Sequence, residues 1–328
     1  MLERDSRCLL PSPVSQLPQE LEQRLTAIGI VPQSCDLASG LFNPSRQAMT
    51  RREVLRLNDM NRQPLFTLTH DSTQPLEGLL GGNFHAFRTS MMPGLKYKGE
   101  QLMPAFLNEA EFEEWTPLTV SGGPTVGFVG QGHGELQHEM ISSNSDDAVK
   151  RYGLERVSGE QTLKHPINIG LIIRQRVISG LSVSKAVTSN IVVRQINHAH
   201  LKGDLSRLRT EYLENMNQNL FALCVRGVGN YSIRLYEALA MGRIPVIIDE
   251  TMPLPLSGHI DWSALAVKVP IRDIDSVGEI VAAFFDSKTP EELIQMQHAT
   301  RQTWLDFLTR TNFFVHALTD ISQDSKID

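Results

Sequence analysis

The chain has 328 residues, enough for two ordinary domains, and its 41% hydrophobic and 21% charged residues are typical of a globular protein. Its net charge of -6 provides no basic field that would attract phosphate backbones, so we expect no nucleic-acid partner. The 3 cysteines form neither a CxxC pair nor an even framework, which favours a reducing compartment without structural disulfides.

The beginning of the chain carries no recognisable export signal. Met1–Ser15 lacks the apolar core of a signal peptide, and apolar runs such as Ile244–Ile248 are far shorter than the roughly 20 residues that cross a bilayer. We therefore expect a cytoplasmic protein with at most peripheral membrane contact. Helical spacing of apolar residues predicts a helix over Pro18–Ile28.

A small α/β domain is predicted next, with short apolar strands over Pro64–Leu68 and Asn83–Arg88. The turn residues Gly122–Pro124 then mark a boundary, because a fully apolar strand of the buried type follows them. We accordingly predict an acceptor-side domain over residues 1–120 and a second, Rossmann-like domain over residues 121–328.

The second domain alternates between helical and strand patterns. Strands separated by helices predict βαβ units and a parallel sheet, whose ligands bind at the carboxyl ends of the strands. A capped helix begins at Thr289, and the aromatic residues of its C-terminal part are assigned to packing. The predicted strands are Thr125–Val129, Asn190–Arg194, Leu220–Val225 and Ile244–Asp249, and the predicted helices between them are Leu171–Ser182, Leu205–Asn217 and Ser232–Met241.

The loop after the strand that ends at Val225 has the layout of an anion site. Glycines allow a ligand to approach the backbone, the first turn of the following helix offers unpaired N–H groups, and Arg226 adds a fixed cation. The spacing is neither GxGxxG nor that of a P-loop, which argues against NAD and ATP. The alternative, that the glycines only form a tight turn, stays open. The loop residues concerned are Arg226, Gly227, Gly229, Asn230 and Ser232.

The helix after this loop is predicted to be two-sided. Its apolar face, which includes Ile233, Leu235 and Tyr236, is expected to pack on the sheet. Arg234 and Glu237 fall on the other face, three residues apart, and form either a solvated ion pair or contacts with phosphate and ribose.

The segment Cys224–Val246, with the sequence CVRGVGNYSIRLYEALAMGRIPV, resembles the signature of the exostosin-like glycosyltransferases. The blocks Leu254–Leu256 and Ile260–Trp262 are similar to the next family block, and Arg88 and Glu100 are weaker matches. The resemblance covers roughly residues 64–314.

The resemblance implies a fold with two Rossmann-like domains facing a cleft, of the GT-B type, and a sugar transfer from a UDP-sugar with inversion at the anomeric carbon. It assigns Arg226, Ser232 and Arg234 to the diphosphate, Glu237 to the ribose and Arg194 to the donor cleft. A bacterial-type cytoplasmic member would act on a glycan or glycolipid acceptor in polysaccharide biosynthesis.

Two further features bear on the mechanism. His70 and Asp71 follow a strand of the first domain and resemble a histidine-aspartate block of some family members, so they are our candidates for the base; capping of a turn by Asp71 is the alternative. The DxD triplet Asp273–Asp275 precedes a helix and is interpreted as ordinary capping, so we expect neither a metal nor another cofactor.

Two rival functions stay open. A sugar-nucleotide epimerase on the same architecture would consume donor without acceptor, and a non-catalytic member would bind nucleotide or glycan as a scaffold. The intact segment from Arg226 to Arg243 argues against the second rival.

Overall fold

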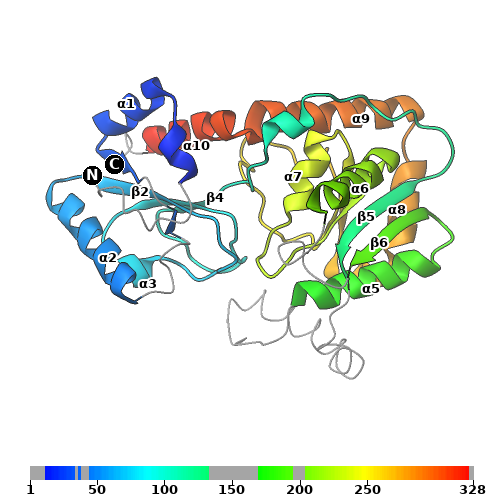
Figure 1. The fold of residues 1–328 in the computed structure, drawn as a ribbon, viewed down its shortest axis with the longest axis horizontal. Coiled ribbons are helices and arrows are strands. Elements are labelled where there is room, and N and C mark those ends of the chain that lie inside the picture. The colour runs from blue at the N-terminus through cyan, green and yellow to red at the C-terminus, as the bar shows by residue number, and fades with distance from the viewer. Residues whose placement is uncertain (1–11, 34–35, 38–43, 133–168, 195–203, 325–328) are drawn as a thin grey trace. The chain divides into compact units, whose positions relative to one another are not determined.

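The computed structural model describes the whole chain except residues 1–11, 34–35, 38–43, 133–168, 195–203 and 325–328 (Figure 1). Its internal contacts divide the chain into two compact units. The first comprises Met1–Phe106, Pro253–His259 and Asp306–Asp328, and the second comprises Leu107–Met252 and Ile260–Leu305. No helix in the described ranges is long and apolar enough to cross a membrane.

This division differs from the predicted boundary at residues 120 and 121. The C-terminal residues, which we expected in the second domain, belong to the first unit because their aromatic side chains fill its core. The local sequence could not predict this, because an apolar helix face indicates that the helix is packed but not which sheet it packs on.

The first unit contains a parallel sheet with the strand order β1-β2-β3-β4. Helices cover both faces of this sheet. Its elements are η1 (Pro13–Gln16), α1 (Gln19–Ala27), β1 (Ile30–Pro32), α2 (Pro44–Asp59), β2 (Gln63–Leu68), α3 (Glu77–Leu80), β3 (His85–Arg88), β4 (Glu100–Leu102) and α10 (Arg310–Asp324).

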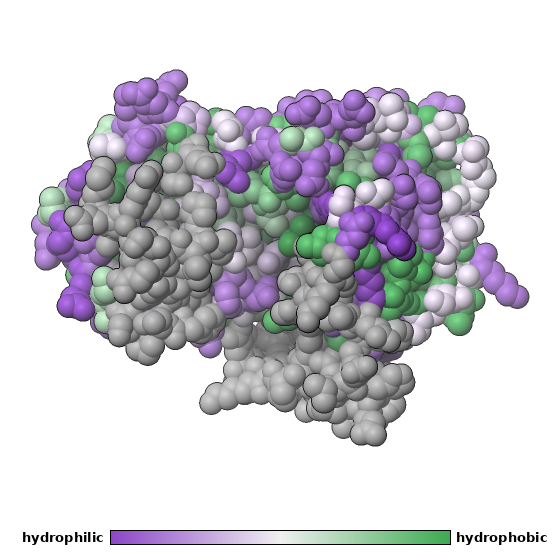
Figure 2. Space-filling view, viewed as in Figure 1, coloured by the Kyte–Doolittle hydropathy of each residue, from purple (hydrophilic) through white to green (hydrophobic). Residues whose placement is uncertain are grey.

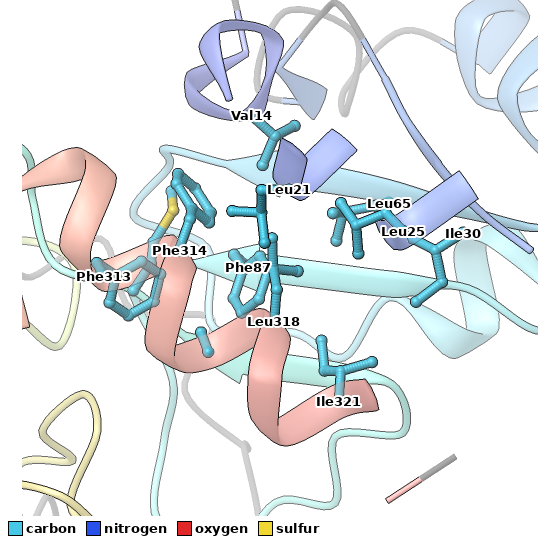
Figure 3. Close-up of a cluster of buried hydrophobic side chains, with 12 residues drawn as sticks. Val14, Leu21, Leu25, Ile30, Leu65, Phe87, Phe313, Phe314, Leu318 and Ile321 are labelled. Carbon is cyan, nitrogen blue, oxygen red and sulfur yellow. The ribbon is translucent and has the colours of Figure 1, made fainter. Parts of the chain in front are cut away.

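Alternating side chains of the strands divide the core of the first unit into two layers. Leu65 and Phe87 belong to the cluster with α1 and α10, whereas their neighbours Phe66 and Ala86 belong to the cluster with α2 and α3. Figure 3 shows the first cluster, in which Phe313 and Phe314 of α10 lie beside Phe87.

The second unit contains a parallel sheet with the strand order β6-β5-β7-β8-β9. Helices α5 and α8 contact one another along the sheet, and α6 and α7 contact the strands β5, β7 and β8. Its elements are η3 (Glu109–Phe112), β5 (Thr125–Gln131), α5 (Ile169–Val183), β6 (Thr188–Arg194), α6 (Leu205–Gln218), β7 (Phe221–Cys224), α7 (Ile233–Ala240), β8 (Ile244–Ile248), β9 (Val267–Val269), η5 (Ile271–Ser276), α8 (Val277–Asp286) and α9 (Pro290–Thr303).

The C-terminal helical segment is interrupted. The helix α9 begins with the predicted capping box, in which Thr289 and Glu292 bond to each other's backbone N–H at 3.2 and 2.7 Å. A π-helical turn, Trp304–Leu308, then separates α9 from α10. The helix predicted to begin at Thr289 therefore ends at Thr303, and the aromatic residues Phe313 and Phe314 belong to the separate helix α10.

The architecture confirms the predicted α/β class with two Rossmann-like units, each built on a parallel sheet. One side chain is placed wrongly by the helical pattern: Ile233 was expected to pack on the sheet, but it is 50% exposed. It is the first residue of α7, where the chain has only just turned away from the loop.

Candidate functional site

The second sheet has a switch point in its strand order. The chain passes from β5 to β6 on one side and then returns to place β7 on the other side of β5. In open parallel sheets, ligands bind in the crevice at such a point, beyond the carboxyl ends of the strands. The carboxyl ends of β5 and β7 therefore define where a ligand of this unit is expected.

The predicted anion loop begins at the end of β7. Arg226 is buried, and its guanidinium donates to Asn230 Oδ1 at 3.1 Å and to the Val228 carbonyl at 2.8 Å. A Cβ at Gly227 would meet no atom of the described residues within 4 Å. Ser232 is the N-cap residue of α7, but its side chain makes no capping hydrogen bond. Hydrogen bonds from Arg226 to other loop residues thus hold the loop, and no described atom lies close to Gly227 on its Cβ side.

Exposed apolar side chains flank the loop. Val228 is 57% exposed, and Ile233 lies just beyond Ser232. Figure 2 shows apolar residues beside strongly hydrophilic ones on the visible face of the second unit.

Arg234 of α7 reaches the carboxyl end of β5. Its guanidinium donates to the Val129 carbonyl, and its central carbon lies 4.3 Å from the ring centroid of Phe128 and 4.8 Å from that of Tyr212. Both ring contacts are within the range of cation–π attraction. The side chain predicted for phosphate binding therefore lies at the switch point.

Glu237, one turn further along α7, is buried and already bonded. Arg209 donates to its Oε1 at 2.6 Å, and the Tyr212 hydroxyl donates to its Oε2. Burial raises the pKa of Tyr212, so this hydroxyl stays a donor. The ion pair between Arg234 and Glu237, one of the two alternatives for this face, is not among the described contacts; both side chains contact Tyr212 instead.

Arg194 lies at the carboxyl end of β6, the strand beside β5. It donates to Glu211 at 2.6 Å and to the Leu208 carbonyl at 3.0 Å. Its charge is thus balanced by a carboxylate on α6.

Arg174 of α5 was missed by the reasoning from sequence. It donates to the Gln131 carbonyl at 2.8 Å and to the Arg226 carbonyl at 3.0 Å, and so bridges the end of β5 and the loop after β7. One feature of the sequence could have pointed to it: Arg174 directly follows the apolar residues Leu171–Ile173 of a predicted helix. An arginine next to such a run is expected to have a specific partner rather than a solvated side chain.

Both aspartates of the DxD triplet form ion pairs with arginines. Asp275 accepts from Arg176, and Asp273 lies 3.6 Å from Arg272. Within the ranges that the structure describes, no group of three or more His, Cys, Asp or Glu side chains could hold a metal ion.

The candidate base residues lie in the first unit, directly after β2. Asp71 is exposed, and His70 Nδ1 accepts from the Ser72 N–H at 2.8 Å. A neutral His70 therefore carries its proton on Nε2. The acceptor nitrogen of His70 is thus already engaged by the backbone.

The loop that carries these residues is held by side chains. Every backbone carbonyl from His70 to Gln74 accepts a hydrogen bond from a side chain. These side chains belong to the last residue of β3 and to the segment that follows it. The donors are Arg88, Thr89 Oγ1, Ser90 Oγ and Tyr97 Oη.

Comparisons with known proteins agree with the resemblance seen in the sequence. Residues 173–284 match the Exostosin GT47 domain. The chain is 36% identical over 74 residues to the probable β-1,4-xylosyltransferase IRX10 of Arabidopsis thaliana, covering 23% of this chain and 18% of that protein. It is 36% identical over 88 residues to the probable glucuronosyltransferase GUT1 of Oryza sativa subsp. japonica, covering 27% of this chain and 20% of that protein.

The chain thus spans about a fifth of the length of these plant relatives. Among solved structures, a glycosyltransferase from Rickettsia africae ESF-5 is similar with a TM-score of 0.43 and 10% identity, covering 95% of this chain and 83% of that one.

Proposed function

We propose that this chain, which carries an exostosin-like glycosyltransferase domain over residues 173–284, transfers a sugar from a UDP-sugar to a hydroxyl of a glycan or glycolipid with inversion. The observation that supports this most is the gathering of Arg226 and Arg234 at the switch point of the second sheet, inside the matched domain. Positive charge at that place suits a nucleoside diphosphate.

In this proposal the diphosphate is bound by Arg226, Ser232 and Arg234. Guanidinium groups bind two phosphate oxygens at once, and the first turn of α7 adds N–H groups and a favourable dipole. The same groups would stabilise the negative charge that develops on the departing UDP, which is why we propose transfer without a metal ion.

Glu237 is proposed to accept hydrogen bonds from the ribose hydroxyls. Its two oxygens already accept from Arg209 and Tyr212, but a carboxylate has about four lone-pair sites. The two existing bonds fix the orientation of the carboxylate before the nucleotide arrives, which lowers the entropic cost of binding.

Asp71 is proposed as the base. The acceptor oxygen forms a bond to the anomeric carbon from the side opposite the leaving group, while the bond from that carbon to the β-phosphate oxygen breaks and its electron pair leaves with UDP. The hydroxyl proton passes to the Asp71 carboxylate. His70, whose neutral form has its proton on Nε2, would donate a hydrogen bond to an acceptor oxygen.

A thermal-shift and calorimetric screen tests the donor site. The folded protein is titrated with UDP, GDP and CMP, and the titrations are repeated with Arg226→Ala and Glu237→Ala. We expect UDP to raise the melting temperature of the wild type and each substitution to weaken that effect. Arg272→Ala is the control, because its side chain is 76% exposed and its ion pairs are long, at 3.6 and 3.9 Å. If no nucleotide stabilises the wild type, the proposal is wrong.

A transfer assay tests the base and separates the rivals. The relatives named above motivate UDP-xylose and UDP-glucuronic acid as first donors and β-1,4-xylan oligosaccharides as first acceptors. Asp71→Asn is expected to bind UDP like the wild type but to lose transfer by about a hundredfold or more. Donor consumption without acceptor would favour the epimerase, and nucleotide binding without any turnover of these donors would favour the non-catalytic member.

A further inference from the structure

Arg174 and Arg234 form a pair of cations at the switch point. Arg174 comes from α5 and Arg234 from α7, yet both guanidinium groups lie near one ring, at 5.7 and 4.3 Å from the centroid of Phe128. Each also donates to a carbonyl of β5, Arg174 to Gln131 and Arg234 to Val129. The two charges are therefore gathered at the carboxyl end of a single strand.

The charges of this pair are unbalanced within the described part of the chain. Arg209 is neutralised by Glu111 and Glu237, and Arg194 by Glu211. No carboxylate among the described residues contacts Arg174 or Arg234, whose recorded partners are carbonyls and aromatic rings. Burial, and then the charge of Arg234, lower the pKa of Arg174 to about 10, so both groups are charged at neutral pH and repel each other.

A buried arginine is not by itself a ligand site, as Arg243 shows. Arg243 is more deeply buried than Arg174, but it precedes β8 and donates to Gln297 Oε1 and the Thr116 carbonyl, so it links segments at the amino end of the sheet. Arg174 differs in two respects: it lies at the carboxyl ends of β5 and β7, and it faces a second cation.

One N–H donor of the Arg174 guanidinium makes no hydrogen bond to a described residue. Its Nη1 and Nη2 donate to carbonyls, whereas its buried Nε, like that of Arg243, has no partner among the described residues, so this feature alone does not distinguish Arg174. Since the Nη2 bond ends on the Arg226 carbonyl, the guanidinium also fixes the first residue of the anion loop. Cations that are partly removed from water and lack a counter-charge are costly, and a bound dianion would offset that cost.

We propose that Arg174 is a further residue of the diphosphate site, which holds the Arg226 loop against β5 and, together with Arg234, supplies the positive charge that the bound diphosphate neutralises. This inference rests on the proposed donor site, but it does not depend on the identity of the base or the sugar. Inorganic pyrophosphate is therefore the sharpest probe, with UDP as the second ligand.

The experiment is calorimetric titration of the full chain with pyrophosphate and with UDP at several salt concentrations. The variants are Arg174→Met and Arg174→Lys. The matched control is Arg176→Met, on the same helix, which removes an arginine paired with Asp275. Circular dichroism and the melting temperature show whether each variant is folded.

We expect Arg174→Met to lose about tenfold to a hundredfold in affinity for both ligands, as for a charge-assisted contact. Arg174→Lys should lose less, because it keeps the charge but not the fork that bridges two carbonyls. The affinity of Arg174→Met should also depend less on salt than that of the wild type, which a purely structural defect would not produce. Arg176→Met should bind like the wild type.

The outcomes separate the two proposals. If the wild type binds UDP and both Arg174 variants bind with unchanged affinity and salt dependence, Arg174 has only a structural role and the inference is wrong, whereas the donor site stands. If pyrophosphate binding depends on Arg174 but UDP does not bind, the inference holds and the proposed function is wrong. If the wild type binds neither ligand, both are wrong. Should Arg174→Met not fold, Arg174→Lys decides by the same criteria.

Discussion

Arg88 Nη1 donates to Glu100 Oε2 at 2.5 Å, and neither side chain is exposed. This ion pair joins the last residue of β3 to the first residue of β4, and both side chains bond to the segment after β2. Arg88 donates to the carbonyls of Ser72 and Gln74, and Glu100 Oε1 accepts from the Leu76 N–H at 2.6 Å. The pair therefore fixes the loop that carries Asp71.

Replacing one partner of this pair should strongly destabilise the protein. Arg88→Met leaves a buried carboxylate and several carbonyls without their donor, and we expect a loss of roughly 3–5 kcal/mol in the free energy of unfolding in urea. The double variant Arg88→Met with Glu100→Leu should recover part of that loss. Arg56→Met, which removes an exposed ion pair with Glu53 in the same unit, should change little. Equal effects of Arg88→Met and Arg56→Met would contradict the importance of the buried pair.

A methyl group at position 170 should disturb the anion loop. A Cβ on Gly170 would lie 2.1 Å from the Gly227 carbonyl oxygen and 2.7 Å from that of Arg226, and backbone atoms cannot move aside cheaply. Gly170→Ala should therefore weaken pyrophosphate binding by about tenfold or more, since misplaced ligating groups lose their contacts. The control is Gly180→Ala on the same helix, whose Cβ would lie 3.0 Å from the Asp275 carbonyl oxygen, away from the loop. Wild-type binding by Gly170→Ala would mean that loop geometry does not set affinity.

The role of Glu237 can be separated from that of the arginines by the choice of ligand. Glu237→Gln should weaken UDP binding by about tenfold and leave pyrophosphate binding unchanged, because only UDP has a ribose. In the wild type, UDP should bind more tightly than 2′,3′-dideoxy-UDP, and this preference should be lost in the variant. If the preference persists in Glu237→Gln, the ribose is recognised by another residue.

Cys224, the last residue of β7, should be unreactive in the native protein. Burial raises the pKa of its thiol to about 12, and the thiolate is the reactive form. Alkylation with iodoacetamide at pH 8, followed by peptide mapping, should leave Cys224 unmodified until the protein is unfolded in urea. Because the anion loop begins just after this residue, UDP should protect it further at intermediate urea concentrations. Rapid labelling in the absence of urea would show that this end of β7 opens easily.

Local patterns predicted much of the second unit. The apolar runs of β5, β7 and β8 and the capping box of α9 specify their elements within a few residues, because each pattern is complete within a short segment. Strands β1, β4 and β9 were missed, since each has only three residues and is stabilised by its neighbours in the sheet. Helix α2 was missed as well, because its sequence contains several arginines and few apolar residues, so the helical spacing of its apolar positions is weak.

The candidate site was predictable only in part. The loop and the helix start identified Arg226 and Arg234 because glycines, a cation and a helix adjoin one another in the sequence. Arg174, Arg209 and Tyr212 owe their positions to contacts between separate helices, to which no local pattern refers. For the same reason the sequence did not reveal that Glu237 already has two donors.

The division of the chain into units sets an order for its synthesis. Phe313 and Phe314 complete the core beside Phe87, although more than two hundred residues of chain separate them from that strand. The strands β1 to β4 are made before the second unit, and η1 and α1 cover part of their apolar face, but α10 completes this cluster only after the second unit has been made. The first unit therefore completes its core only after the second unit has been synthesised, so part of its apolar surface is exposed for longer during translation.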